Sequence, residues 1–206
     1  MILNRFPDKS KFLQLAQNYD VVPVCAQVLA DTHTPVSLFG RFYDNKGPIF
    51  FLESVEGGER WGRYSFLGFS SHLMARVYAD RLEVEQDGAV RRVAHAGRPS
   101  QALKELLAPY RHADLFNLPR FWGGLVGHIN YEMVSFLEAI PNRWPPDKAL
   151  ACFMIPGEVL IFDNARHTLL IVAITFPKQN PAAAWVDAEA PLEKSQEKIA
   201  APRVHR

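Results

Sequence analysis

Apolar runs separated by short turn sequences constrain the fold of this chain more than any other feature. Between residues 72 and 94, apolar side chains alternate with polar ones in three short runs, the last two separated by Asp87-Gly88. An Asp-Gly pair favours the tight turns of β-hairpins. Residues 158–174 repeat the arrangement, with two apolar runs on either side of a polar turn. The sequence therefore predicts antiparallel strands joined by hairpins.

Two further segments are predicted to be strands. Residues 36–42 alternate between apolar and polar side chains around Gly40, and residues 49–54 are nearly all apolar. A continuous apolar run of this length is typical of a strand that is buried on both faces.

Helices are predicted in three places, where apolar residues recur at positions i, i+3, i+4 and i+7. They come singly and do not follow every strand, so an α+β fold with antiparallel sheets and a few flanking helices is favoured over a doubly wound one. The three apolar stripes are Phe12, Leu15, Ala16 and Tyr19; Leu103, Leu106, Leu107 and Tyr110; and Met133, Phe136, Leu137 and Ile140.

A change in composition divides the chain after Phe176. Residues 1–176 are predicted to form one domain, whereas residues 177–206 are rich in alanine, proline and charge. This second part is interpreted as a linker, or as a helix that packs on a region absent from the chain. Pro191 is expected to interrupt such a helix, because proline lacks the N–H that the helix interior needs.

Charge and hydropathy exclude several classes of partner. The 206 residues include 23 Lys and Arg against 22 Asp and Glu, so nothing favours a nucleic acid or an anionic membrane. No apolar stretch reaches the roughly 18 residues of a membrane span. Cys25 and Cys152 lie in apolar surroundings and are expected to be inert thiols. A cytoplasmic protein is the expectation.

Common catalytic and metal motifs are weak here. Phosphate-binding loops of the G-x-x-x-x-G-K-[ST] and G-x-G-x-x-G types do not occur. His128 and Glu132 are four residues apart, but two ligands do not make a metal site. The glycines at 123, 124 and 127 allow either a ligand or a second backbone to approach closely, and tight strand packing is the favoured interpretation.

The densest polar cluster lies at residues 51–69, where Glu53 and Ser54 end the apolar run. A carboxylate that ends a buried strand needs a partner, because desolvating it alone is costly. Arg60 or Arg63 is one candidate, and the ammonium group of a ligand is another.

Four stretches carry a resemblance to a known family, and together they span roughly residues 8–176. The chain resembles the N-terminal region of anthranilate synthase component I, in the chorismate-utilising enzyme family. The stretches are TPVSLFGRF (34–42), FLESVEGGERWGRYSFLGF (51–69), FWGGLVGHINYEMVSFLEAIP (121–141) and ACFMIPGEVLIFDNARHTLLIVA (151–173).

The resemblance implies a role in tryptophan biosynthesis. Family enzymes convert chorismate and ammonia to anthranilate and pyruvate, with magnesium at the chorismate site and ammonia from a glutamine amidotransferase, component II. L-tryptophan inhibits them from a separate site between the sheets of the N-terminal region. The chorismate and magnesium residues of the family lie in a later catalytic region that this sequence does not match. The resemblance thus implies a regulatory domain that holds no metal, is inactive alone and works with its own catalytic region.

The effector site of the family corresponds to Leu52, Glu53 and Ser54. The Glu53 carboxylate would accept hydrogen bonds from the ammonium group of tryptophan, and the Ser54 hydroxyl would add a contact. Arg63 is added on chemical grounds as a cation for the effector carboxylate. A structural ion pair of Arg63 with Glu53 or Glu56 is the alternative. Because part of the family pocket comes from the missing region, weak or undetectable tryptophan binding is expected of the chain alone.

Two alternatives to this function remain. Residues 128–130 and 135–136 depart from the family pattern, which leaves the N-terminal domain of aminodeoxychorismate or isochorismate synthase as one alternative. A stand-alone amino-acid-binding module without a catalytic role is the other. Residues 51–69 favour anthranilate synthase over the sister enzymes.

Overall fold

The computed structural model describes residues 2–53, 62–141 and 143–201. The chain forms two compact units, and each is made of segments that are far apart in sequence. Unit 1 comprises residues 1–70, 111–123 and 157–206, and unit 2 comprises residues 71–110 and 124–156.

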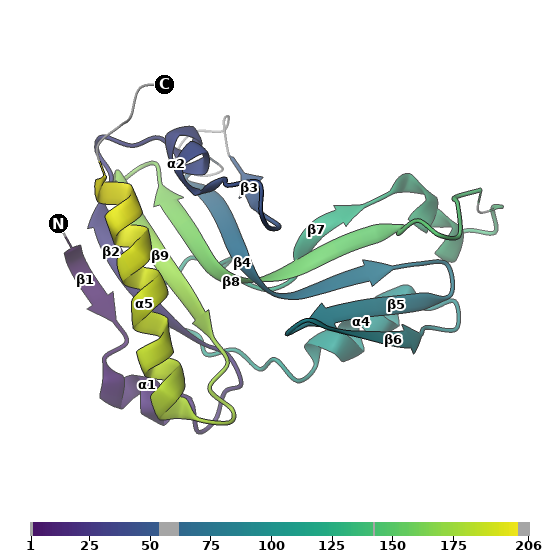
Figure 1. Ribbon diagram of the computed structural model, residues 1–206, viewed down its shortest axis with the longest axis horizontal. Coiled ribbons are helices and arrows are strands. Elements are labelled where there is room, and N and C mark those ends of the chain that lie inside the picture. Colours follow the sequence, from purple (N-terminus) through teal and green to yellow (C-terminus); the bar gives the residue numbers. More distant parts are fainter. Residues whose placement is uncertain (1, 54–61, 142, 202–206) are drawn as a thin grey trace. The chain divides into compact units, whose positions relative to one another are not determined.

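Helices and strands are distributed over the units as follows (Figure 1). Unit 1 contains β1 (Ile2–Phe6), α1 (Lys9–Leu15), β2 (Val22–Leu29), α2 (Pro35–Phe42), β3 (Phe50–Leu52), β9 (Thr168–Thr175) and α5 (Pro181–Ala200). Unit 2 contains β5 (Arg81–Gln86), β6 (Ala89–Ala94), α4 (Pro99–Leu107), β7 (Val126–Ile129) and the 3₁₀-helix η1 (Tyr131–Phe136). Two long strands contribute residues to both units, β4 (Tyr64–Val77) and β8 (Ala151–Asp163).

The pairing of the strands confirms the predicted fold class. Hydrogen-bonded strands follow the order β1-β2-β9-β8-β4-β5-β6, with β3 paired to β4 and β7 paired to β8. The registers described for these pairs are all antiparallel, and an isolated bridge between Val21 and His112 is parallel. The protein is thus an α+β fold built on antiparallel strands.

Both predicted hairpins are present. β5 and β6 are joined at Asp87 and Gly88, which have positive φ angles of 50° and 76°. Two successive positive φ values are the signature of the type I′ turn, which glycine adopts without steric cost. β8 and β9 form the second hairpin and pair from Glu158 with Ala173 to Asp163 with Thr168.

Residues 36–42 are not a strand, as the alternation indicated, but helix α2. Thr34 caps this helix, since the Ser37 backbone N–H donates to Thr34 Oγ1 at 3.1 Å and the Thr34 N–H donates to Ser37 Oγ at 2.9 Å. This reciprocal capping satisfies N–H groups that would otherwise lack partners. Leu38 and Phe42, four residues apart, are the buried residues of α2. That spacing places two side chains on one face in a helix and in a strand alike, so it did not distinguish the two structures.

Two further predictions need correction. The strand predicted at residues 49–54 is confined to β3, whose residues are half-buried or exposed, because β3 pairs only with β4 among the described strands. The helix predicted from Met133 to Ile140 is instead the short η1, in which no residue is buried. By contrast, the helices predicted around Phe12 and Leu106 are present as α1 and α4.

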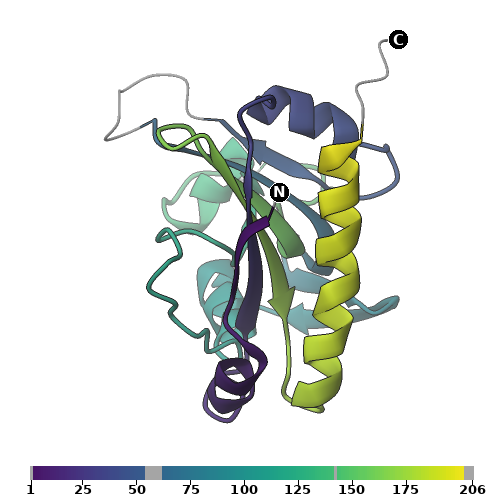
Figure 2. The ribbon, with the colours of Figure 1, turned by 90° about the vertical axis from the view of Figure 1, so that its left-hand side faces the viewer.

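Residues 181–200 form one continuous helix, α5, that Pro191 does not interrupt. Asn180 caps it by accepting a hydrogen bond from the Ala183 N–H at 3.1 Å, and Pro181 occupies the first turn, where its missing N–H costs nothing. Proline inside a helix costs about 3 kcal/mol, so tertiary packing must offset the loss. Figure 2 shows α5 lying alongside the strands of unit 1, and it contacts β9 and β2.

The packed face of α5 is a stripe spaced by three or four residues, and it belongs to the core of unit 1. Phe12 of α1 also meets Trp185 of α5, with 5.2 Å between ring centroids. Of the two predicted alternatives, a linker or a helix, the described residues form a helix, and it packs on its own chain. The buried residues of α5 are Ala188, Leu192, Ser195 and Ile199.

Arg41 of α2 secures the C-terminal end of α5. Its Nη1 atom donates to the carbonyl oxygens of Lys198 at 2.9 Å and Ala201 at 2.6 Å. The last carbonyls of a helix lack partners within it, and an arginine there also suits the negative end of the helix dipole. Both ends of α5 are thus satisfied by hydrogen bonds.

We expect Leu192→Ala to lower the free energy of unfolding by about 2–5 kcal/mol, because it leaves a cavity where α5 meets the sheet. Leu192 is 1% exposed, whereas Val186 on the same helix is 58% exposed. Val186→Ala is therefore the matched control, with an expected change within about 0.5 kcal/mol. Urea unfolding followed by circular dichroism measures both, and equal midpoints for the two variants would refute the packing role of α5.

Candidate functional site

The predicted effector residues begin at the end of β3. Leu52 is the last residue of β3, lies opposite Phe66 of β4 and is 47% exposed. Glu53 follows the strand and is also exposed, whereas Ser54 lies outside the described residues. The burial argument for Glu53 is therefore wrong, since an exposed carboxylate does not need a protein partner. Its proposed role toward a ligand stays a prediction.

Arg63 is paired with a carboxylate of the β8–β9 hairpin. Its Nη2 atom donates to Asp163 Oδ2 at 2.7 Å and its Nε atom donates to Asp163 Oδ1 at 3.1 Å. The backbone N–H groups of Ala165 and Arg166 each donate to Oδ1 at 3.2 Å. A two-point contact between arginine and carboxylate has restricted geometry. Arg63 thus forms a structural ion pair with Asp163, a partner that the sequence had not indicated. Of the two predicted partners, Glu56 lies outside the described residues.

The same pair determines the charge state of Asp163. Burial acts to raise the pKa of Asp163, but the hydrogen bonds and the positive charge of Arg63 outweigh it and hold that pKa below its usual range. A cavity of about 470 Å³ opens beside the pair, and neither Leu52 nor Glu53 is among its lining residues. Arg63 and the predicted effector residues Leu52 and Glu53 therefore do not line this cavity together.

A buried carboxyl group that the sequence interpretation missed lies on β8. Glu158 is 3% exposed, and Ser195 Oγ of α5 is hydrogen-bonded to its Oε1 atom. A single acidic residue within the apolar run of residues 153–162 was the signal that would have identified it, because an isolated buried carboxylate is costly.

Burial raises the pKa of Glu158 to about 7, and the hydrogen bond from Ser195 and the charges of Lys198 and Lys194 oppose that rise only in part. At neutral pH the carboxyl group is therefore divided between its protonated and ionised forms. A carboxyl group that titrates in this range within a packed fold marks a candidate functional site.

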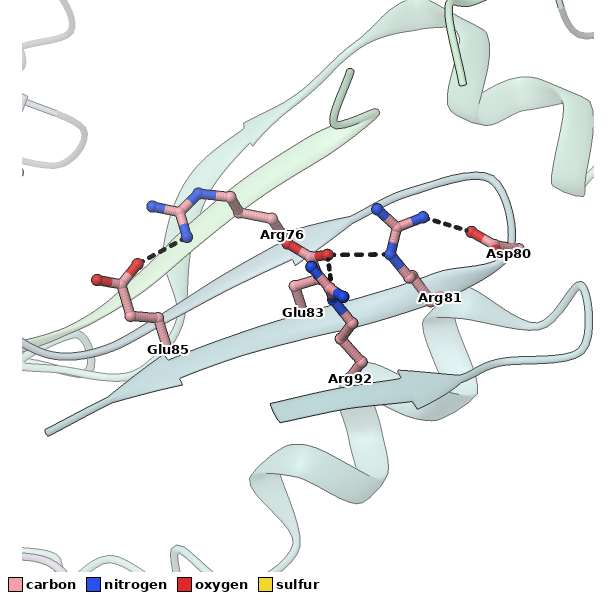
Figure 3. Close-up of polar contacts among 6 residues, drawn as sticks. All are labelled: Arg76, Asp80, Arg81, Glu83, Glu85 and Arg92. Carbon is pink, nitrogen blue, oxygen red and sulfur yellow. Dashed lines mark hydrogen bonds and ion pairs between the residues drawn. The ribbon is translucent and has the colours of Figure 1, made fainter. Parts of the chain in front are cut away.

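Unit 2 carries a separate network of charged side chains on neighbouring strands (Figure 3). Glu83 accepts hydrogen bonds from Arg81 Nε at 3.0 Å and Arg92 Nε at 2.9 Å, and Arg76 pairs with Glu85 at 2.8 Å. The hydrogen bond from Arg81 is the main cause that holds the pKa of Glu83 below its usual range. Such cross-strand pairs stabilise a sheet, so we interpret the network as structural.

Two other residues singled out from the sequence, Gly127 and Cys25, have structural explanations. A Cβ atom on Gly127 would overlap the carbonyl group of Cys152, so tight packing of β7 on β8 explains that glycine. Cys25 is fully buried, and burial raises the pKa of its thiol, which makes the thiolate inaccessible. Cys152 is half-buried.

Within residues 2–53, 62–141 and 143–201, no three side chains of His, Cys, Asp or Glu are grouped so as to hold a metal ion. In the same part of the chain, no helix has the length and hydropathy that crossing a membrane requires.

The chain is similar to several curated proteins named anthranilate synthase component 1, although no protein-family model matches it. It is 36% identical over 186 residues to the protein of Acetivibrio thermocellus, which covers 89% of this chain and 37% of that protein. It is 31% identical over 200 residues to the protein of Pseudomonas aeruginosa, which covers 95% of this chain and 40% of that protein. For the protein of Aquifex aeolicus the identity is 33% over 165 residues, with coverages of 79% and 33%.

A solved structure is also similar. It is the crystal structure of anthranilate synthase component I from Streptococcus pneumoniae TIGR4, with a TM-score of 0.48 and 17% sequence identity. The similarity covers 86% of this chain and 39% of that chain. The chain thus spans well under half the length of the proteins that it matches.

We expect the stability of the protein to fall as pH rises from 5 to 8, because of Glu158. Its pKa in the folded state, about 7, is above the ordinary glutamic acid value of 4.5. Folding therefore favours the protonated form, and this contribution, roughly 3 kcal/mol at most, is full below pH 4.5 and is lost as pH passes 7. Urea unfolding at pH 5, 6, 7 and 8 measures the effect.

Glu158→Gln should flatten this dependence, since glutamine does not titrate. Glu193→Gln, at an exposed position of α5, should leave it as in the wild type. Parallel pH profiles for wild type and Glu158→Gln would contradict the assignment.

Proposed function

Because the chain belongs to the anthranilate synthase component 1 family, we propose that it serves as the N-terminal, effector-binding region of such an enzyme. The observation that carries the proposal is the 36% identity over 186 residues, which extends over 89% of this chain. The complete enzyme would act in the cytoplasm, where it converts chorismate and ammonia to anthranilate and pyruvate for tryptophan biosynthesis. Ammonia would come from a glutamine amidotransferase, component II.

The proposed effector is L-tryptophan, held at the end of β3. The Glu53 carboxylate accepts hydrogen bonds from the effector ammonium group, and the Ser54 hydroxyl adds a contact. Charge-assisted hydrogen bonds of this kind are roughly twice as strong as neutral ones. The exposure of Leu52 and Glu53 supports a site that is completed by residues from outside this chain.

Arg63 is proposed as the cation near the effector carboxylate. Because Asp163 already accepts two hydrogen bonds from its guanidinium group, part of its charge is neutralised. Its contribution to effector affinity should therefore be smaller than that of Glu53.

The lyase chemistry is assigned to the catalytic region that the family has and this sequence does not match. Magnesium supplies charge neutralisation at the chorismate site of the complete enzyme. The described residues of this chain offer no cluster of side chains that fits a metal ion, so magnesium would be held by residues outside them. The relatives reported above are all named anthranilate synthase component 1, which favours this function over the sister synthases.

In a full-length protein that carries this chain, Glu53→Ala and Ser54→Ala should each relieve inhibition by tryptophan and leave uninhibited turnover within about twofold of wild type. The reason is that both residues contact the effector and neither contacts chorismate. Anthranilate fluorescence against tryptophan concentration measures the inhibition. Glu138→Ala, at an exposed position of unit 2, is the control, and unaltered inhibition in both test variants would refute the effector site.

The purified chain should form no anthranilate from chorismate, ammonia and magnesium, because the groups that stabilise the transition state are absent.

Calorimetry should show that tryptophan binds the full-length protein at least about tenfold more tightly than the chain alone, since the chain supplies only part of the pocket. Equal tryptophan affinities of the chain and the full-length protein would contradict the partial pocket, and fluorescent anthranilate formed by the chain alone would contradict its predicted inactivity.

A further inference from the structure

A cavity of about 340 Å³ in unit 1 has none of the predicted effector residues among its lining. It lies between α5, the adjoining parts of β4 and β8, and the segment that links α2 to β3. Its apolar wall includes Phe42, Ile49 and Phe69, and its polar lining includes Glu158 and Ser195. The cavity is large enough for a small organic molecule.

One part of the cavity lining is formed where β8 approaches β4 closely. A Cβ atom on Gly157 would lie 2.5 Å from the carbonyl oxygen of Ser70, so only glycine fits beside it. Ser70, which also lines the cavity, has a φ of 57°. Residues other than glycine rarely adopt this conformation, and such backbone strain is concentrated at functional sites.

The cavity is surrounded by positive charge. Lys46, Lys194 and Lys198 line it, and Lys198 Nζ lies 5.0 Å from the centre of the Phe42 ring. In the described part of the chain, none of these three ammonium groups lies within 4.0 Å of a carboxylate oxygen. Three lysines that line one cavity without a salt bridge to a carboxylate favour an anionic ligand.

The other titratable groups around the cavity have local partners. Asp44 Oδ1 accepts a hydrogen bond from the Lys46 backbone N–H at 3.0 Å, and the Tyr43 hydroxyl is hydrogen-bonded to Asn45 Oδ1 at 3.1 Å. Together with Glu158 and the three lysines, these are the titratable residues that line the cavity. Even with both carboxylates ionised, the lining keeps a positive net charge.

The hydrogen bond between Ser195 and Glu158 links the cavity to protonation. A serine hydroxyl has one proton to donate and two lone pairs that accept. When Glu158 is ionised, Ser195 must donate its proton to that carboxylate. When Glu158 is protonated, the carboxyl group can donate to Ser195 Oγ, and the serine proton becomes available to a ligand in the cavity.

From this geometry we propose that the cavity binds a small oxyanion, a carboxylate or a phosphate-type group, and that it does so when Glu158 is protonated. The ammonium groups of Lys194 and Lys198 attract the anion, and Ser195 donates a hydrogen bond to it. An ionised Glu158 disfavours binding both by repulsion and by keeping the Ser195 proton. Binding therefore takes up a proton, and affinity falls as pH rises through neutrality.

Calorimetric titration of the purified chain with sulfate and with malonate, at pH 6 and pH 8, tests the proposal. Sulfate represents a phosphate-type group and does not titrate in this range, and malonate represents a carboxylate. We expect affinity for at least one of them to be about tenfold higher at pH 6, because the protonated fraction of Glu158 differs by that factor. The anion that binds more tightly shows whether the cavity prefers a phosphate-type group or a carboxylate.

Variants separate this mechanism from general attraction to a positive surface. Glu158→Gln should bind at both pH values about as tightly as wild type does at pH 6, because its amide N–H can donate to Ser195 as the protonated carboxyl does. Lys194→Ala and Ser195→Ala should each weaken binding at pH 6 by about fivefold or more. Lys148→Ala, at an exposed position of unit 2, is the matched control and should bind as wild type.

The results for wild type and the variants distinguish proton-linked anion binding from its alternatives. Binding at pH 6 that is lost in Lys194→Ala and becomes independent of pH in Glu158→Gln would support the proposal. It would be overturned by the absence of binding at pH 6, by equal affinity of wild type at both pH values, or by a pH dependence that persists in Glu158→Gln. None of these results depends on the tryptophan site proposed at β3.

Discussion

The packing of α5 on β9 and β2 is the interaction on which unit 1 depends most. The helix contributes Leu192 and Ile199 to the same core as Phe12 of α1. This burial outweighs the roughly 3 kcal/mol that Pro191 costs inside a helix, as expected when helical stability comes from tertiary packing more than from propensity. The same packing carries Ser195 over Glu158, so the cavity beneath α5 exists only while the helix is docked.

Two carboxyl groups of β8 show how the surroundings of a side chain determine its chemistry. Glu158 and Asp163 are both buried and lie on one strand. Asp163 meets a guanidinium group, and its pKa is lowered. Glu158 meets a hydroxyl and more distant lysines, and its pKa is raised to about 7. The first is therefore a constant anion that organises a turn, whereas the second is a group whose charge changes near neutral pH.

Resemblance to relatives identified the family of the chain, whereas the burial argument about the site was wrong for Glu53. The apolar run at residues 49–54 indicated a strand buried on both faces, with Glu53 at its end. In the structure β3 pairs only with β4 among the described strands, its three residues are half-buried or exposed, and Glu53 is exposed. An apolar run indicates what a strand can bury but not where in the sheet it lies.

The sequence alone was enough to predict the antiparallel hairpins and the fold class, because turn residues and alternation act between neighbours along the chain. The strand predicted for the residues of α2 was wrong, because one spacing of apolar residues fits two structures and the capping by Thr34 decides between them. Only the tertiary structure could reveal that Arg63 meets Asp163, 100 residues away, and that Ser195 meets Glu158, 37 residues away. Such pairs form through packing of distant elements, and side-chain pairing at that range leaves no periodic signal in the sequence.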